Sequence, residues 1–194
     1  MYKSQVKLQK VICLIALCAG AVVFIYALGL LTDLYDMLYN MIPDPDELEN
    51  TRVAGARIYY DMQPFNKLLL YCGILLILLA TGLFVTGTQS RRRYYISNYV
   101  ATGVNVTCQL AAAAWIGVKV QQFRNIYDTT VDFAQLERRL SRLGTYTESR
   151  FWFDVHWFVC GLLVISAALL ITNLILKVKL MKAERDLLEQ GKAV

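Results

Sequence analysis

Polar side chains form a regular row within one apolar stretch of this chain. Five of them recur at the spacing of a single helix face, in steps that combine three and four: Asn98, Thr102, Asn105, Gln109 and Lys119. Amide and hydroxyl groups in such a row can form hydrogen bonds between helices, or they can line a path for water, small solutes or ions. Lipid hydrocarbon cannot satisfy them, so we expect this polar seam to face other helices, a water-filled cavity or a partner protein.

The other reactive side chains are not spaced for catalysis or metal binding. His156 is the only histidine and lies beside Asp154, which suits a satisfied interfacial residue, with pH sensing as the alternative. The acidic residues between positions 44 and 49 lack the glycine-centred spacing of a calcium loop. All five cysteines lie in apolar stretches without a Cys-x-x-Cys pair, which indicates packing residues: Cys13, Cys18, Cys72, Cys108 and Cys160. We therefore expect no enzyme, no metal site and no cofactor.

Four long apolar runs must position these residues. The chain of 194 residues is 57% hydrophobic and only 18% charged, which is too apolar for an ordinary soluble domain. Each run holds about 20 residues without Asp or Glu, the length that crosses ~30 Å of hydrocarbon. The sequence predicts an all-α integral membrane protein, a four-transmembrane-helix bundle that forms a single membrane domain over residues 1–194. The predicted spans are residues 11–31, 68–87, 96–118 and 158–176.

Basic residues indicate which side of the membrane each segment faces. Three consecutive arginines occupy the very short turn between the second and third predicted spans: Arg91, Arg92 and Arg93. Because Lys and Arg accumulate on the cytoplasmic side, we expect this turn, the N-terminus and the C-terminal tail at 177–194 to be cytoplasmic. Loops 32–67 and 119–157 then lie on the outer side, where Trp152 and Trp157 mark the membrane interface.

These basic flanks also account for the net charge of +5, so the charge does not indicate a nucleic-acid partner. The basic N-terminus followed by a long apolar run fits an uncleaved signal anchor. The expected partners are the lipid bilayer and either other membrane protein subunits or further copies of the same chain. We expect a multi-pass protein of the plasma membrane or a bacterial inner membrane rather than of an organelle.

Both outer loops contain helical patterns. The period of the first span continues past Leu31 and stops before Pro43, and a new helix is predicted from Pro45 to about Ala54. In the second loop an apolar stripe recurs among charged residues at helical spacing: Phe133, Leu136, Leu140 and Leu143. The stripe must be covered by the first loop, the bilayer surface or a partner, which makes these residues partner-contact candidates. The C-terminal tail also keeps a helical period.

Two classes of function fit these features. In the first, the protein is a non-catalytic accessory, scaffolding or regulatory subunit of a larger membrane complex, contacted through the third span and the outer loop helices. In the second, several copies form a homo-oligomeric channel or pore lined by the polar seam. The in-out pattern is similar to that of tetraspanins, claudins and connexins. The loop cysteines on which those families depend are absent, so we assign the chain to none of them.

Overall fold

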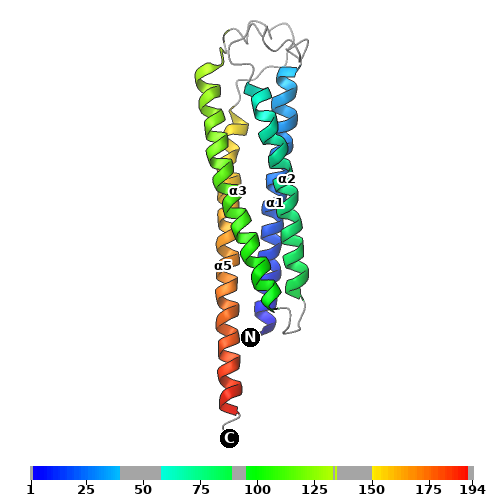
Figure 1. Cartoon of the computed structure of the whole chain (residues 1–194), viewed down its shortest axis with the longest axis vertical. Coiled ribbons are helices and arrows are strands. Elements are labelled where there is room, and N and C mark those ends of the chain that lie inside the picture. The colour runs from blue at the N-terminus through cyan, green and yellow to red at the C-terminus, as the bar shows by residue number, and fades with distance from the viewer. Residues whose placement is uncertain (1, 40–57, 89–94, 133, 135–149, 192–194) are drawn as a thin grey trace.

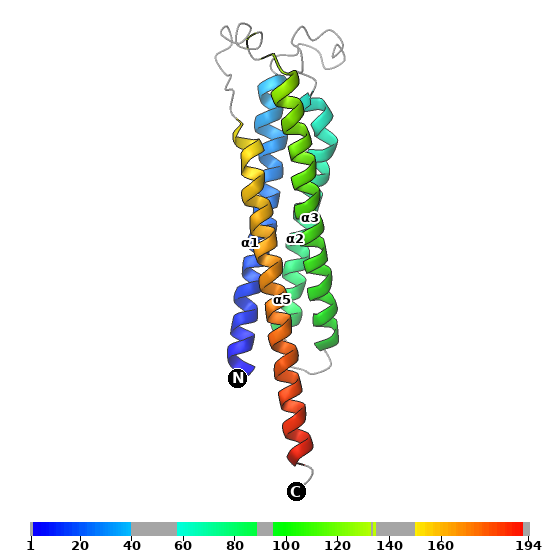
Figure 2. The same ribbon diagram turned by 90° about the vertical axis from the view of Figure 1, so that its left-hand side faces the viewer.

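Four long helices form an elongated bundle (Figures 1 and 2). The computed structural model describes residues 2–39, 58–88, 95–132, 134 and 150–191, and these residues contain no strand. The helices are α1 (Tyr2–Tyr39), α2 (Ile58–Thr88), α3 (Tyr95–Thr130) and α5 (Phe151–Gly191). Both chain termini lie at one end of the bundle, which we name the terminal end, and we name the opposite end the loop end (Figure 1). The last turns of α5 project beyond the other helices at the terminal end.

Each helix packs against two antiparallel neighbours, in the cyclic order α1, α2, α3, α5. Buried residues recur along the helices mainly in steps of three and four, the pattern of helices that pack knobs-into-holes in a four-helix bundle. On α5 this buried row consists of Phe153, His156, Val159, Leu163, Ser166, Leu170, Asn173 and Lys177. The row contains four polar residues, so the seam between α3 and α5 carries polar groups from both helices.

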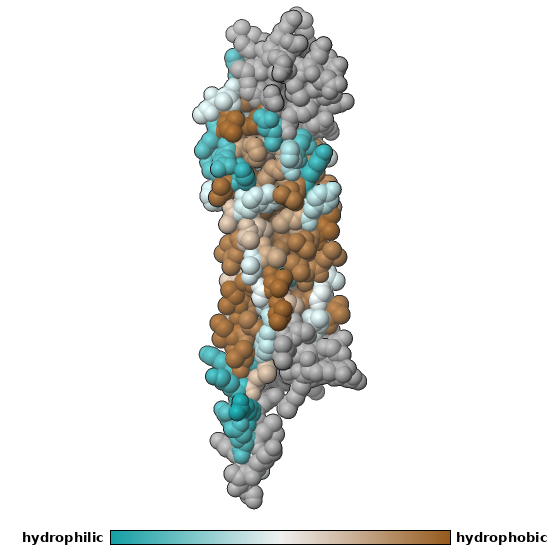
Figure 3. Space-filling model, in the orientation of Figure 1, coloured by the Kyte–Doolittle hydropathy of each residue, from teal (hydrophilic) through white to brown (hydrophobic). Residues whose placement is uncertain are grey.

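All four helices are long and apolar enough to cross a membrane, as the sequence predicts. The candidate spans are Ser4–Thr32, Asp61–Gly87, Asn98–Thr130 and Phe151–Leu187. Large apolar side chains cover much of the outer surface, and Figure 3 shows them as a belt between more hydrophilic ends. This distribution suggests a multi-pass membrane protein.

The helices extend further than the apolar runs alone indicate. Both α2 and α3 reach into the segments that the sequence predicts as loops 32–67 and 119–157. A helix satisfies its own backbone hydrogen bonds in water as well as in lipid, so it needs only side-chain contacts to continue. Tyr127 and Phe153 supply such a contact near the loop end, with ring centroids 5.0 Å apart. The predicted helical tail is confirmed as far as Gly191.

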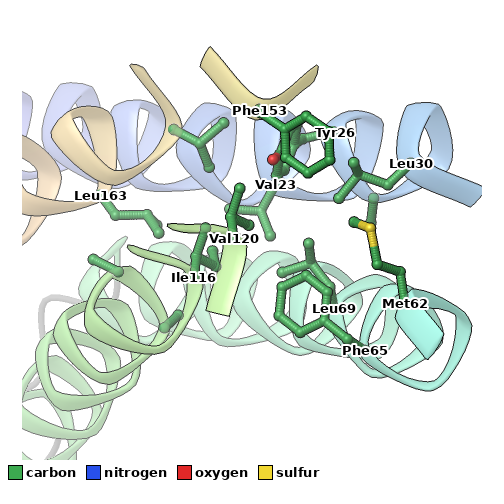
Figure 4. Close-up of a cluster of buried hydrophobic side chains, with 14 of the residues drawn as sticks. Val23, Tyr26, Leu30, Met62, Phe65, Leu69, Ile116, Val120, Phe153 and Leu163 are labelled. Carbon is green, nitrogen blue, oxygen red and sulfur yellow. The ribbon is translucent and has the colours of Figure 1, made fainter. Parts of the chain in front are cut away.

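The apolar core is concentrated in the loop-end half and receives side chains from every helix (Figure 4). The residues labelled there include Val23 and Tyr26 from α1, and Phe65 from α2. Phe65 packs on the ring of Trp115, with centroids 4.8 Å apart. A second, smaller cluster lies nearer the terminal end and consists of Ile12, Cys13, Ala16, Ala80, Leu83 and Leu170.

Glycines bring the backbones of α1 and α2 into contact. A Cβ atom added to Gly73 would lie 2.8 Å from both the N and the Cα of Phe24, and one added to Gly20 would lie 3.0 Å from the N of Ile77. The pair of small residues Ala16 and Gly20 in the first span is thus part of a close helix contact. This contact fixes the distance between two helices that are consecutive in the chain.

Candidate functional site

The polar seam of α3 is buried inside the bundle of its own chain. Asn98, Thr102, Asn105 and Gln109 are at most 3% exposed. Lys119 does not belong to this buried face, because it is exposed to the outside of the bundle. The buried row of α3 steps from Ile116 to Val120, so that Lys119 falls beside the row and not on it. The seam therefore ends at Gln109.

The structure adds a lysine to the seam that the sequence did not single out. Lys177 is only 7% exposed, and its Nζ donates a hydrogen bond to Asn98 Oδ1 at 2.6 Å. The same ammonium group lies over the ring of Tyr99, 5.6 Å from its centroid. Side chains of an α-helix lean toward its N-terminus, and for α5 that direction leads into the bundle. The apolar run ends at this lysine, so hydropathy alone marks it as a span boundary.

Three amide side chains from α1 and α5 complete a network around this pair. Gln9 Nε2 donates to Asn98 Oδ1 at 3.4 Å, and Gln5 Nε2 donates to Asn173 Oδ1 at 3.3 Å. Gln5 Nε2 also donates to Gln9 Oε1 at 3.4 Å. We name these residues the terminal network: Gln5, Gln9, Asn98, Asn173 and Lys177. It ties α1, α3 and α5 together at the terminal end of the bundle, and Asn98 Nδ2 also donates to Thr86 Oγ1 of α2 at 3.4 Å.

The positions of these amides in the buried rows are the sequence signal that could have identified them. Gln5 and Gln9 precede the buried Ile12 and Ala16 at steps of four, three and four along α1. Lysines that alternate with the glutamines, Lys3, Lys7 and Lys10, obscure this pattern in the sequence. Gly87 of α2 leaves room for them, because a Cβ at this position would collide with the Gln9 amide.

A second polar layer lies in the middle of the bundle. Gln109 Nε2 donates to Asn105 Oδ1 at 2.7 Å, one turn apart on α3. Ser166 of α5 is fully buried, and its hydroxyl has no hydrogen-bond partner among the residues that the structure describes. We name Asn105, Gln109 and Ser166 the middle layer. It is the deepest group of polar side chains in the α3–α5 seam that starts at the terminal network.

Ion pairs join α3 to the start of α5 at the loop end. Arg124 Nη1 lies 2.8 Å from Asp154 Oδ1, and Arg150 Nε lies 2.9 Å from Asp128 Oδ1. These side chains are partly exposed, so we expect each pair to contribute at most about 1 kcal/mol to stability. They set the register of the helices at this end rather than form a reactive site.

The two tryptophans predicted to mark the outer interface occupy different environments. Trp152 is partly buried against α1, where its ring fills the space beside Gly29 and its carbonyl oxygen accepts a hydrogen bond from Tyr26 Oη at 2.8 Å. Trp157 is 62% exposed on the outside of the bundle. Only Trp157 therefore presents most of its ring to the surroundings.

His156 differs from the sequence expectation of a satisfied interfacial residue. The ring is fully buried, and its Nδ1 contacts the carbonyl oxygen of Phe153. Its Nε2 has no hydrogen-bond partner among the described residues. Asp154, its neighbour in sequence, points elsewhere and pairs with Arg124. The difference arises because His156 belongs to the buried row of α5, whereas Asp154 lies on another face of the helix.

The remaining candidates are the cysteines, possible metal ligands and residues outside the described part of the chain. All five cysteines are free, and no group of three or more His, Cys, Asp or Glu side chains is placed to hold a metal ion among the described residues. The following predicted residues lie outside the described residues: Arg91, Arg92, Arg93, Phe133, Leu136, Leu140 and Leu143. Comparisons with protein-family models, with curated proteins and with solved structures gave no match for this chain.

Proposed function

We propose that this protein is a non-catalytic membrane subunit that binds and scaffolds another membrane protein, with the outward face of α3 as its docking surface. The observation that carries the proposal is the division of α3 into two faces. Its polar seam is used inside its own bundle, and its outward face presents small residues: Gly103, Thr107, Ala111 and Ala114. A Cβ atom added to Gly103 would meet nothing within 4 Å.

A face of small residues in a membrane favours contact with another helix over contact with lipid. Small side chains let two backbones approach closely, and the packing they permit drives helix association in bilayers. Large apolar side chains are exposed on all four helices, such as Leu68 on α2 and Ile165 on α5, and on α3 Val104 and Leu110 flank the row of small residues. The α3 span also has the lowest mean hydropathy of the four. The partner expected here is therefore a transmembrane helix of another protein.

Enlarging the small face of α3 is expected to release the partner and leave the bundle folded. The change is Gly103→Leu with Ala111→Leu, and the matched control is Gly82→Leu, an exposed glycine of α2 with equally open surroundings. Native mass spectrometry in mild detergent measures the complex directly. The α3 variant should appear at the mass of a single chain, while the wild type and the control keep the additional mass.

Two outcomes of that measurement would contradict the proposal. A wild-type protein that has the mass of one chain has no stable partner. Masses at whole multiples of the chain would instead favour the homo-oligomeric alternative. A pore lined by the polar seam would also require Asn105 and Gln109, which are buried within one chain, to turn toward neighbouring copies. No observation favours such a rearrangement, so the accessory role remains our proposal.

The stripe Phe133, Leu136, Leu140 and Leu143 is proposed as a second contact with the partner. Its spacing is the whole support for this role. Replacing Leu136 and Leu140 with aspartate is expected to remove partner mass without lowering the thermal stability of the four helices. A loss of stability with the partner retained would place the stripe against its own chain instead.

Membrane insertion with a cytoplasmic terminal end completes the proposal, in the plasma membrane or a bacterial inner membrane. It is supported by the four apolar helices and by the arginines at 91–93. We expect a thiol introduced as Asn50→Cys, in a chain without its native cysteines, to react with an impermeant reagent outside intact cells. A thiol at Ser90→Cys should react only after the cells are opened. The reverse result would invert the orientation.

A further inference from the structure

Three buried polar atoms of the middle layer have no hydrogen-bond partner among the described residues: Asn105 Nδ2, Gln109 Oε1 and Ser166 Oγ. Together they offer a donor, an acceptor and a hydroxyl that can act as either. Leaving such groups dry is costly, and the cost is larger inside a membrane than near bulk water. Natural cores satisfy groups of this kind with bound water when space and partners permit.

The three atoms lie at one level of the α3–α5 seam. The Cys160 thiol of α5 donates to the Ala113 carbonyl oxygen of α3 at 3.3 Å, which shows that these two positions of the antiparallel helices are level. Ser166 lies six positions after Cys160 on α5, toward the terminal end. Thr107 lies six positions before Ala113 on α3, also toward the terminal end, and it stands between Asn105 and Gln109 in the chain. Ser166 is therefore level with the amide pair of α3.

Polar groups continue from this layer to the terminal end at every turn of α3. Thr102 and Asn98 follow Asn105 on the buried face of α3. On α5 the apolar Leu170 comes first and is followed by Asn173 and Lys177, so the continuous row of polar groups in this half belongs to α3. Thr102 Oγ1 donates to the Asn98 carbonyl oxygen, and Asn98 Oδ1 accepts from Lys177 Nζ. Water that enters beside the terminal network would thus find hydrogen-bonding groups as far as the middle layer.

Directly beyond the middle layer, on its loop-end side, the same seam is apolar, and the next buried polar side chain of α5, His156, lies farther toward the loop end. Beyond Gln109 the buried face of α3 presents Ala112 and Ile116, and beyond Ser166 the buried face of α5 presents Leu163. These three residues belong to the large apolar cluster of the loop-end half. They offer no side-chain hydrogen-bonding group, so they would stop a chain of water molecules at the level of Ser166.

We propose that the terminal half of the α3–α5 seam is a hydrated half-channel that binds water as far as Ser166 and is closed toward the loop end. It goes beyond the accessory role, and it rests only on the membrane insertion proposed above. The labelling at Asn50 and Ser90 tests insertion separately, so a dry seam and a wrong membrane assignment give different results.

Cysteine reactivity toward silver ion tests the half-channel, because this small ion travels through water and not through lipid. The variant is Ser166→Cys in the full chain without its native cysteines, reconstituted into vesicles of one orientation. The matched control is Ala167→Cys, since Ala167 is adjacent and equally buried. We expect silver added at the terminal end to block the thiol at position 166 at least tenfold faster than the thiol at 167. Silver added at the loop end should block neither thiol.

Each other outcome overturns the proposal. A thiol at 166 that is protected from both sides means that the seam is dry. Equal and fast reaction at 166 and 167 means that the bundle admits water generally, and reaction at 166 from both sides means a through passage. Thermal stability confirms that both variants are folded.

A second measurement uses a smaller change in the native chain. Ser166→Ala removes the hydroxyl and fills nearly the same volume. If the hydroxyl binds water, this change lowers the melting temperature, because Asn105 and Gln109 then lose a shared water. If the seam is dry, the change removes an unsatisfied polar group and raises the melting temperature. Alanine also raises helix propensity, so the shift is measured relative to Ser4→Ala, which replaces an exposed serine of α1. The sign of this difference supports or overturns the proposal independently of any reagent.

Discussion

Replacing Gly73 with alanine is expected to destabilise the bundle, although the same substitution at Gly161 is expected to stabilise it. An added Cβ at Gly73 would lie 2.8 Å from the backbone N and Cα of Phe24, and these atoms can move only if α1 and α2 separate. Overpacking of this kind costs about 1–3 kcal/mol. At Gly161 nothing lies within 4 Å, so the higher helix propensity of alanine, roughly 1 kcal/mol, is left as the main effect.

Both free energies of unfolding are measured by denaturant titration of the purified protein in detergent. Both substitutions change glycine to alanine in a helix interior. Any difference between them therefore comes from the surroundings and not from the change of residue type. Equal shifts for the two variants would contradict a glycine-mediated contact between α1 and α2. Gly20→Ala should fall between the two, because its Cβ would lie 3.0 Å from the backbone N of Ile77, a contact that a shift of a few tenths of an ångström relieves.

Replacing Asn98 with leucine is expected to have the largest effect within the terminal network. The change removes the oxygen that accepts hydrogen bonds from Lys177 Nζ and Gln9 Nε2. A hydrogen bond to a charged group contributes about 1.5–3 kcal/mol, and truncating one partner also leaves the buried ammonium without this acceptor. We therefore expect Asn98→Leu to lower the free energy of unfolding by about 2 kcal/mol or more.

Replacing Lys177, the donor to Asn98, tests whether the loss comes from the buried charge. Lys177→Met keeps a long apolar side chain and removes the charge, so it should cost less than Asn98→Leu. Combining Lys177→Met with Asn98→Leu should recover part of the loss caused by Asn98→Leu alone. Lys119→Met is the matched control, because Lys119 is exposed on α3, and it should change stability by no more than about 0.5 kcal/mol. Strictly additive losses would show that the network is not coupled.

Lys119 and Lys177 show that residue spacing alone does not predict which lysine is buried. Lys119 continues the polar period of α3 in steps of three and four, yet it is exposed. Lys177 ends the last apolar run and is buried. A helical period allows either a step of three or a step of four at each turn, and it does not say which one the neighbouring helix will cover. The buried step from Ile116 to Val120 decided this for α3.

The sequence by itself determined that the chain forms long apolar helices and that α3 has a polar face, because run length and helical period are local properties. Only the tertiary structure decided what meets that face. Gln9 and Lys177 are 89 and 79 positions from Asn98 in the chain, yet both donate to its side-chain oxygen. Those contacts depend on the rotation and the axial offset of three helices, which are set by packing between segments distant in sequence. The same packing makes Gly73 a close contact and leaves Gly161 open.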